Sequence, residues 1–161
     1  MWSRISSIQM IALSKTIGYA IQALSCLSDP TCRCRSIADI AGCASLPKPY
    51  LAKIVNALVR AGLVKAKRGV GGGITLVRPP AEVSLLQIME AVEGIALARE
   101  CLLGLSECRD ERACPVHEFW KQAHQKIERK LGETTLADVI DFERRNAAGK
   151  RRASKPKPSS S

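Results

Sequence analysis

The feature that most constrains how this 161-residue chain can fold is an amphipathic helical segment followed directly by a basic, glycine-rich hairpin. From Pro47 to Ala61, apolar residues recur at the three- and four-residue spacing that places side chains on one face of a helix. The face expected to be buried carries Leu51, Ile54, Val55, Leu58 and Val59. The opposite, polar face carries Lys48, Tyr50, Lys53, Asn56 and Arg60.

Two short strands are expected after this helix, at Val64–Lys67 and at Ile74–Val77, with Gly62 as the helix C-cap. The turn between them has the sequence Arg68-Gly69-Val70-Gly71-Gly72-Gly73. Its glycines permit a tight turn and a close approach of the backbone to a partner. The sequence therefore predicts a hairpin with a basic entry.

Two helices are expected before this unit. Ser14 can cap a helix with an apolar stripe that ends at Asp29-Pro30. Ser36 can cap a shorter helix, with Asp39 at the capping-box position and Gly42 closing it. The apolar positions expected to face inward are Ile17, Ala20, Ile21, Leu24 and Leu27 in the first helix and Ile37, Ile40 and Ala41 in the second.

The C-terminal half is expected to be helical around one irregular loop. Ser84 can cap a helix with Leu85, Ile88, Met89 and Val92 facing inward. The longest helix is expected from Pro115 to Leu131, and a short helix from Thr135 to about Phe142. The stripe of the longest helix is Val116, Phe119, Trp120, Ala123, Ile127 and Leu131.

Charge and composition divide the chain into five expected segments. Residues 1–9 form a ragged leader, with Met10 a candidate second start, and residues 10–97 form the principal domain. Residues 98–117 form a cysteine-rich loop, and residues 115–142 form the long helix and the short one after it. Much of the formal charge of +10 comes from Arg144 onward, where there is no acidic residue. Residues 146–161 are therefore expected to be a disordered basic tail.

The order helix, short helix, turn, helix and basic hairpin is that of a winged helix-turn-helix. The expected fold is mainly α, with a small two-stranded wing and a long C-terminal dimerisation helix. Lys48, Tyr50, Lys53 and Asn56 would enter the major groove of duplex DNA. Lys67 and Arg68 would meet the minor groove or its phosphates, with Gly69, Gly71 and Gly72 allowing close approach. An enzyme is not expected, because the glycines lack the Lys-Ser/Thr end of a phosphate-binding loop.

Three cysteines mark a candidate metal site in the spacing Cys101-x6-Cys108-x5-Cys114, with His117 three residues further on. Three thiolates within one loop can hold a soft metal centre such as an iron–sulfur cluster, and His117 can face the same site. Zinc and unliganded cysteines are the alternatives, although these gaps are wider than those of a usual zinc knuckle. With seven cysteines and no recognisable export signal, a reducing cytoplasm is the expected location.

The other four cysteines receive a plainer interpretation. Cys26 and Cys43 fall on or beside the inner faces of short helices and are expected to be small core residues. Cys32 and Cys34 form a C-x-C pair in a loop, which could bind metal or oxidise, but no partner ligand is evident nearby.

From about Met10 to Ile140, these residues resemble the IscR-type regulators, the Rrf-two family. The wing and the three-cysteine loop carry the resemblance together, and short motifs elsewhere support it. These motifs are Leu13-Ser14-Lys15 with Tyr19-Ala20, Ile37-Ala38-Asp39-Ile40-Ala41, Tyr50-Leu51 and Leu136-Ala137-Asp138-Val139.

The resemblance implies a homodimer that pairs through the long C-terminal helix, and a cluster that tunes promoter binding. It implies that Cys101, Cys108 and Cys114 are the cluster ligands and that His117 completes a [2Fe–2S] site, which is favoured over [4Fe–4S]. Two departures are the first cysteine gap, one residue longer than in the IscR branch, and Gly18, where the nitric-oxide-sensing branch can supply an aspartate ligand. We expect a DNA-binding transcriptional regulator, a repressor. The alternative is a zinc- or cluster-stabilised dimeric interaction module that holds nucleic acid nonspecifically through its basic tail.

Overall fold

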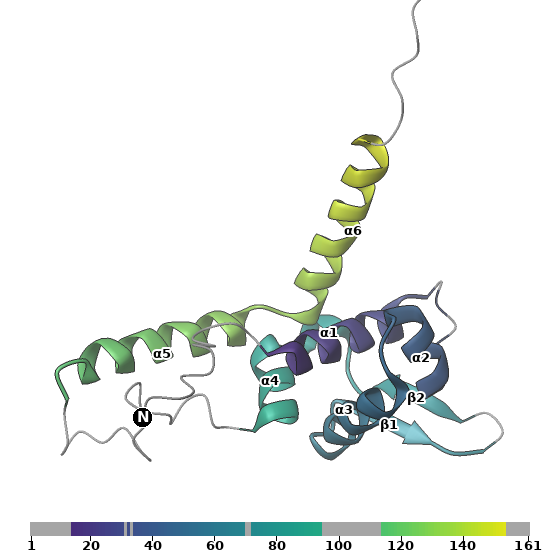
Figure 1. The fold of residues 1–161 in the computed structure, drawn as a ribbon, viewed down its shortest axis with the longest axis horizontal. Coiled ribbons are helices and arrows are strands. Elements are labelled where there is room, and N and C mark those ends of the chain that lie inside the picture. Colours follow the sequence, from purple (N-terminus) through teal and green to yellow (C-terminus); the bar gives the residue numbers. More distant parts are fainter. Residues whose placement is uncertain (1–13, 31, 33, 70–71, 95–113, 154–161) are drawn as a thin grey trace, which may run out of the picture.

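The computed structural model describes residues 14–30, 32, 34–69, 72–94 and 114–153, with residues 147–153 described by their backbone alone. Four helices and a hairpin form the body of the molecule, and the last two helices extend from it in different directions (Figure 1). The elements of the body are α1 (Lys15–Ser28), α2 (Ile37–Ala44), α3 (Lys48–Arg60), β1 (Val64–Lys67), β2 (Gly73–Leu76), the 3-10 helix η1 (Pro80–Glu82) and α4 (Leu85–Glu93). The two extending helices are α5 (His117–Glu133) and α6 (Leu136–Ala153).

The expected helix starts in the body are confirmed by their caps. The hydroxyl of Ser14 accepts a hydrogen bond from the N–H of Ile17 at the start of α1. Ser36 and Asp39 form the expected capping box of α2, each side chain accepting from the backbone N–H of the other. These bonds satisfy N–H groups that have no partner within the helix, which is why the sequence marks these positions so clearly.

The end of α2 differs from the expectation that Gly42 closes it. The helix continues through Gly42 to Ala44, and Ser45 adopts the left-handed conformation at φ 53° and ψ 43°. The N–H of Ser45 donates to the carbonyl of Ala41, which ends the helix one turn after the glycine's expected stop. A glycine inside a helix lowers its stability but does not by itself end it.

The hairpin is an antiparallel pair in which Val64 faces Leu76 and Lys67 faces Gly73. The first strand has the expected bounds, and the second begins one residue earlier than expected, at Gly73. Helix α3 ends at Arg60 with Ala61 as its C-cap, so the expectation that Gly62 is the C-cap is wrong by one residue; Gly62 follows with a φ of 71°. The mainly helical fold with a two-stranded wing is thus confirmed.

One apolar core joins α1 to α4, the hairpin and the start of α6. Its most completely buried side chains are Ile17, Leu24, Ile40, Leu51, Leu58, Val64, Val83, Ile88 and Leu136. The last of these lies in α6, far along the chain from the rest. The helix-turn-helix and the base of α6 therefore belong to one packed unit.

Helix α6 is longer than the short helix expected from Thr135 to Phe142. It runs to Ala153, so residues 146–153, expected in a disordered tail, are helical. Its start is capped by Thr135 and Asp138. The carboxylate of Asp138 accepts hydrogen bonds from the N–H and the hydroxyl of Thr135, and that hydroxyl accepts one from the N–H of Asp138. Once a helix is nucleated, Ala, Arg and Lys propagate it readily without burying a face. Residues 154–161 lie outside the described part of the chain.

Candidate nucleic-acid interface and cysteine sites

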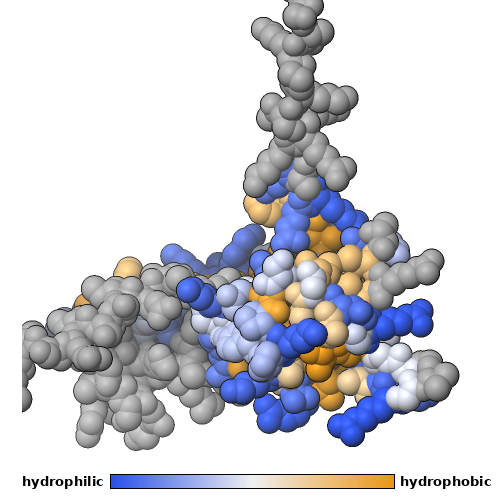
Figure 2. Space-filling model, turned by 45° about the vertical axis from the view of Figure 1, so that its right-hand side comes forward, coloured by the Kyte–Doolittle hydropathy of each residue, from blue (hydrophilic) through white to orange (hydrophobic). Residues whose placement is uncertain are grey.

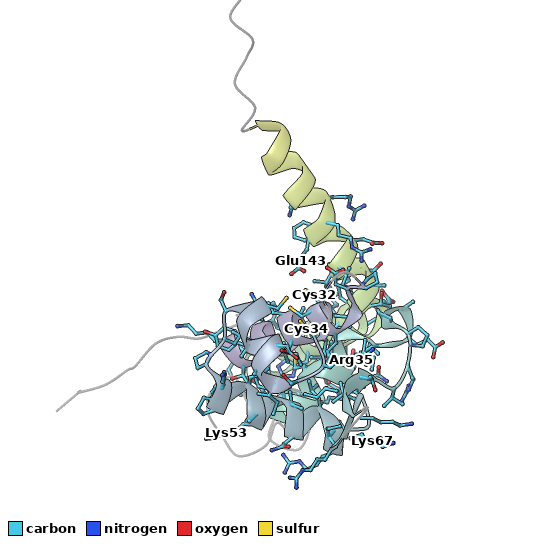
Figure 3. The ribbon with its side chains drawn as sticks, turned by 90° about the vertical axis from the view of Figure 1, so that its right-hand side faces the viewer. Cys32, Cys34, Arg35, Lys53, Lys67 and Glu143 are labelled. Carbon is cyan, nitrogen blue, oxygen red and sulfur yellow. The ribbon has the colours of Figure 1, made fainter. Side chains whose placement is uncertain are left out.

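Helix α3 presents a polar face while its apolar face is held in the core. Lys48, Lys53 and Asn56 are exposed, as expected for side chains that would contact DNA. On the other side of the helix, Leu51 and Leu58 are fully buried. Lys53 on α3 and Lys67 on the wing lie along the edge of the molecule opposite α6 (Figure 3). This arrangement can present donors from both elements to one ligand.

Tyr50 occupies a different environment from the other three residues of this face. It is half-buried, and its hydroxyl is hydrogen-bonded to that of Thr16 on α1. Its ring makes an edge-to-face contact with the ring of Tyr19, with 5.6 Å between centroids. These contacts fix the start of α3 on α1, so Tyr50 fits an anchor better than a base-contacting side chain.

The tip of the wing is exposed and depends on glycine. Lys67, Arg68 and Gly69 are all exposed, and Gly69 has a φ of 94°. The N–H of Gly72 donates to the carbonyl of Gly69 across 2.9 Å. A Cβ on Gly72 would lie 2.2 Å from the carbonyl oxygen of Lys67, so no other residue fits this turn without a shift. Gly71 lies outside the described residues.

The base of the wing is attached to the segment that precedes α2. The N–H of Ile74 donates to the carbonyl oxygen of Arg35. Gly73 has a φ of 150°, and a Cβ there would lie 3.0 Å from the same oxygen. The close approach of these two backbones accounts for a glycine at position 73. The wing therefore has a fixed attachment to the helix-turn-helix.

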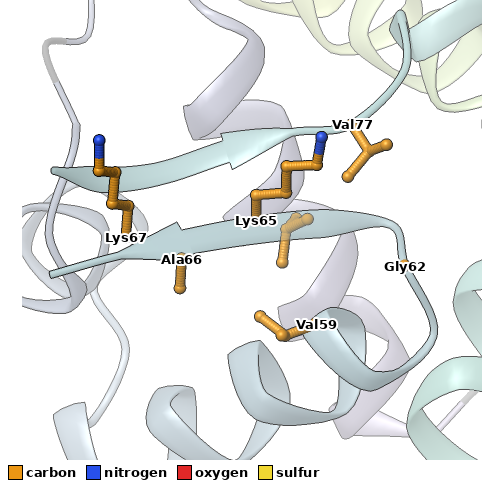
Figure 4. A pocket seen from close by; sticks show the side chains of 7 residues that line it. Val59, Gly62, Lys65, Ala66, Lys67 and Val77 are labelled. Atoms are coloured by element: carbon orange, nitrogen blue, oxygen red, sulfur yellow. The ribbon is translucent and has the colours of Figure 1, made fainter.

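A groove of about 520 Å³ runs between the end of α3 and the wing (Figure 4). Val59, expected in the buried face of α3, is instead 37% exposed and forms part of its wall. The remaining walls come from Gly62, Val64, Lys65, Ala66, Lys67 and Val77. In Figure 2, hydrophilic side chains gather along the lower edge of the body that α1 to α4 and the hairpin form.

Half of the expected cluster site can be located. Cys101 and Cys108 lie outside the described residues. Cys114 is a half-buried free thiol directly before α5, and His117 lies in the first turn of that helix at 7% exposure. The N–H of His117 donates to the carbonyl of Cys114 across 2.9 Å, which places the two residues on one turn of backbone. Both residues therefore lie at the start of α5.

The expectation that Cys26 and Cys43 are core residues is wrong. Cys26, near the end of α1, is partly exposed, and Cys43, near the end of α2, is exposed. The Sγ of Cys43 lies 2.9 Å from that of Cys26 and 3.0 Å from that of Cys32. The ligand atoms of Cys32, Cys34 and Cys43 lie within 4.8 Å of one another. We call Cys26, Cys32, Cys34 and Cys43 the four-cysteine cluster.

The pKa values of the thiols in the four-cysteine cluster are shifted in opposite directions. Burial, then hydrogen bonding to Cys43, raises the pKa of Cys26 to about 12. Hydrogen bonds to Cys43 and Cys34 raise the pKa of Cys32 to about 12 as well. The pKa of Cys43 is lowered because hydrogen bonds with Cys26 and Cys32 stabilise its thiolate. Several thiols that share protons around one sulfur behave as a single site.

Sequence reasoning missed this cluster because its members come from two helices and the loop between them. The available signal was the spacing Cys26-x5-Cys32-x-Cys34-x8-Cys43, four cysteines within 18 residues. Within its own element, each of these cysteines is either alone or part of the C-x-C pair. Because α1 and α2 pack against each other, their C-terminal cysteines meet at the loop that carries the C-x-C pair.

Helices α5 and α6 expose large apolar side chains. Phe119 is 69% exposed on α5, and Phe142 is 57% exposed on α6. Trp120 packs against His124 one turn later, with 4.3 Å between ring centroids. On α5, the exposed Phe119 adjoins the half-buried Trp120, which makes this part of the helix a candidate contact for another protein. Among the described residues, no helix combines the length and apolar content needed to span a membrane.

Comparison with known proteins identifies the family of this chain. A family model described as Rrf2, iron-dependent transcriptional regulator, matches residues 13–142. A putative HTH-type transcriptional regulator of Synechocystis is 36% identical over 126 residues, which cover 75% of this chain and 82% of the relative. One from Aquifex aeolicus is 29% identical over 135 residues, which cover 83% and 94% respectively.

Two solved structures share the fold over most of their length. CymR, the global cysteine regulator of B. subtilis, has a TM-score of 0.66 at 27% identity, covering 83% of this chain and 98% of CymR. IscR of T. potens has a TM-score of 0.65 at 26% identity, covering 85% of this chain and 91% of IscR.

Proposed function

The chain belongs to the Rrf2 family of transcriptional regulators, and from this membership we propose that it is a cytoplasmic, homodimeric repressor whose promoter binding is tuned by an iron–sulfur cluster. Regulation of transcription is common to the family and its relatives. The operator, the dimer and the cluster are the parts that we add for this chain.

The observation that carries the DNA-binding part is the shared edge of α3 and the wing. Lys53 and Asn56 project from a helix whose other face is buried, and Arg68 stands at the tip of the hairpin. A helix of this kind fits the major groove, and an arginine at a wing tip fits the adjacent minor groove or its phosphates. Lys48 at the start of α3 would enter the major groove as well, and Lys67 on the wing would meet the minor groove or its phosphates, with Gly69, Gly71 and Gly72 permitting close approach.

The exposed Phe119 in the apolar stripe of α5 supports a homodimer. Phe119 and its neighbours would be covered by the same helix of a second copy, an isologous arrangement that places two α3 helices on two half-sites. A symmetric operator is therefore expected.

The cluster would be held by Cys101, Cys108 and Cys114, with His117 as the fourth ligand and [2Fe–2S] favoured over [4Fe–4S]. Cys114 and His117 are adjacent at the start of α5, and the family model's description as iron-dependent agrees with a metal centre. Such a cluster supplies a redox- and iron-responsive group. His117 begins the helix proposed for dimer contacts, so its ligation would bias the position of that helix.

The test combines promoter binding with cluster content. Full-length protein purified anaerobically should bind its own promoter in preference to random DNA, with iron and sulfide present. Cys108→Ser should remove the iron and sulfide and change promoter affinity, whereas His117→Ala should leave a weaker cluster with an altered visible spectrum. Equal binding to promoter and random DNA would refute the repressor assignment. Full iron content in Cys108→Ser would refute the ligand assignment.

A further inference from the structure

We propose that Cys26, Cys32, Cys34 and Cys43 bind one Zn²⁺ ion in a tetrahedral site that joins α1 to α2, separate in sequence from the cysteines at 101, 108 and 114. This proposal does not depend on the iron–sulfur cluster. It adds a structural metal to the helix-turn-helix itself.

The four-cysteine cluster draws its ligands from three parts of the fold. Cys26 comes from the last turns of α1 and Cys43 from the last turns of α2, while Cys32 and Cys34 lie in the loop between them (Figure 3). The contacts of 2.9 Å and 3.0 Å converge on the sulfur of Cys43. Two thiols from different parts of the fold thus contact the sulfur of Cys43, although apolar side chains would join the two helices equally well.

The separations fit a mononuclear metal. A Zn–S bond of about 2.3 Å in a tetrahedron places its sulfurs about 3.8 Å apart, so the closest pairs need move apart by only about 1 Å. Cys32, Cys34 and Cys43 already lie within 4.8 Å of one another. Cys26 is outside that set of three, but its sulfur lies 2.9 Å from that of Cys43, and it would move toward Cys32 and Cys34 to become the fourth ligand. A cluster of several irons spreads its thiolates over different metal atoms and needs a wider set. Four thiolate ligands are one of the usual sets of structural zinc sites.

A disulfide accounts for the arrangement less well. Two sulfurs, those of Cys26 and Cys32, contact the same sulfur of Cys43, which can form only one disulfide bond. Any such bond would leave thiols unpaired within the cluster. A single cation accepts all four donors, and its binding releases their protons to solvent.

Four thiolates and the Zn²⁺ that they hold carry two net negative charges together, and both arginines and the carboxylates of Asp29 and Asp39 lie near this site. Arg33 and Arg35 flank Cys34 in the sequence, and Arg35 is exposed beside the cluster. The carbonyl of Arg35 also accepts the hydrogen bond from Ile74, which ties this loop to the wing. A metal here would therefore stabilise both the α1–α2 contact and the attachment of the wing.

The experiment is metal analysis of the full-length protein, purified anaerobically without a histidine tag. We expect about one zinc per chain. Cys32→Ser and Cys43→Ser should each lose that zinc while keeping the iron, sulfide and visible spectrum of the wild type. Cys108→Ser is the matched control and should keep the zinc whatever it does to the iron. The two proposals can therefore fail independently.

A second measurement uses the unmodified protein, so that it does not depend on whether a variant folds. Co²⁺ exchanged for the native metal should give the absorption of a tetrahedral tetrathiolate site, and the bound metal should protect four cysteines from alkylation. Absence of zinc with all four cysteines freely alkylated would overturn the proposal. Recovery of a disulfide among these residues, zinc retained in Cys32→Ser, or iron and sulfide lost from that variant would each overturn it as well.

Discussion

The backbone N–H of Ile74 donates a 2.9 Å hydrogen bond to the carbonyl oxygen of Arg35, which joins the base of the wing to the residue that follows Cys34. Whatever holds the loop between α1 and α2 thereby also holds the wing. A change in how firmly the four-cysteine cluster holds this loop should therefore change how firmly the hairpin is held.

The first prediction concerns this link. Removing the proposed zinc, by chelation or by Cys34→Ser, should speed hydrogen exchange at the amide of Ile74 because its acceptor lies in the loosened loop. Exchange at the amide of Ile54, in the middle of α3, serves as the control and should change less. Equal exchange at Ile74 with and without metal would show that the loop is rigid without an ion.

The second prediction concerns the turn of the wing. Gly72→Ala places a Cβ against the carbonyl of Lys67 and should cost about 1–3 kcal/mol of strain in the hairpin. Promoter affinity should fall, as measured by fluorescence anisotropy. Gly42→Ala is the matched control, because nothing lies within 4 Å of its Cβ and it is helical. That variant should raise the free energy of unfolding by about 0.5–1 kcal/mol.

The third prediction concerns Arg68 at the exposed wing tip. Arg68→Ala should weaken binding to the promoter by about 1–3 kcal/mol, the usual loss for one groove-inserted arginine. Arg129→Ala removes the same charge from α5 and should have a much smaller effect on promoter affinity. If both variants lose the same affinity, the contribution of Arg68 is general charge rather than a groove contact.

The fourth prediction concerns the exposed stripe of α5. Phe119→Asp should convert a dimer into a monomer at micromolar concentration, because an isologous interface places the new charge against its copy. Sedimentation velocity measures the outcome. Gln125→Asp introduces a charge at an exposed polar position of the same helix and should leave the dimer intact. A wild-type protein that is already monomeric would contradict the pairing proposed for α5.

The fifth prediction concerns pH and the capping box of α2. Hydrogen bonds from the side chain and backbone of Ser36, and from the backbone N–H of Arg35, lower the pKa of Asp39 below its ordinary value of 3.8. A lowered pKa in the folded state means that the charged carboxylate stabilises the fold above pH 3.8. That contribution is lost as the pH falls through the lowered pKa.

Denaturant unfolding of the wild type and of Asp39→Asn across this range provides the measurement. The difference in free energy of unfolding should be constant near neutral pH and should shrink below pH 3.8. If the difference stays the same down to the lowest pH, the charge of the Asp39 carboxylate contributes nothing to the free energy of unfolding.

Local chemistry explains why much of the fold was predictable from the sequence. Ser36 and Asp39 mark a helix start within four residues, and the spacing of apolar residues from Leu51 to Leu58 marks its buried face. Such signals act over one or two turns of helix. The exposure of Val59 could not be predicted from such signals, because it depends on how the hairpin after Gly62 packs against the end of α3.

The four-cysteine cluster could not be predicted in the same way. Its sulfurs meet only after α1 and α2 pack, so neither helix alone shows that its last cysteine has a partner. The length of α6 could not be predicted for a related reason. A composition that cannot build a core does not by itself mean disorder, because a well-capped start and residues of high helix propensity extend α6 to Ala153.

Two residues separate α5 from α6, and both are held by the body of the molecule. The N–H of Leu85 donates to the carbonyl of Thr134, and the N–H of Leu136 donates to the carbonyl of Val83. Since Leu136 is completely buried, this joint cannot slide along the surface. The joint therefore fixes the angle at which α5 leaves the body. Because His117 lies at the other end of this 17-residue helix, a small change of that angle would move His117 much further than it moves Thr134.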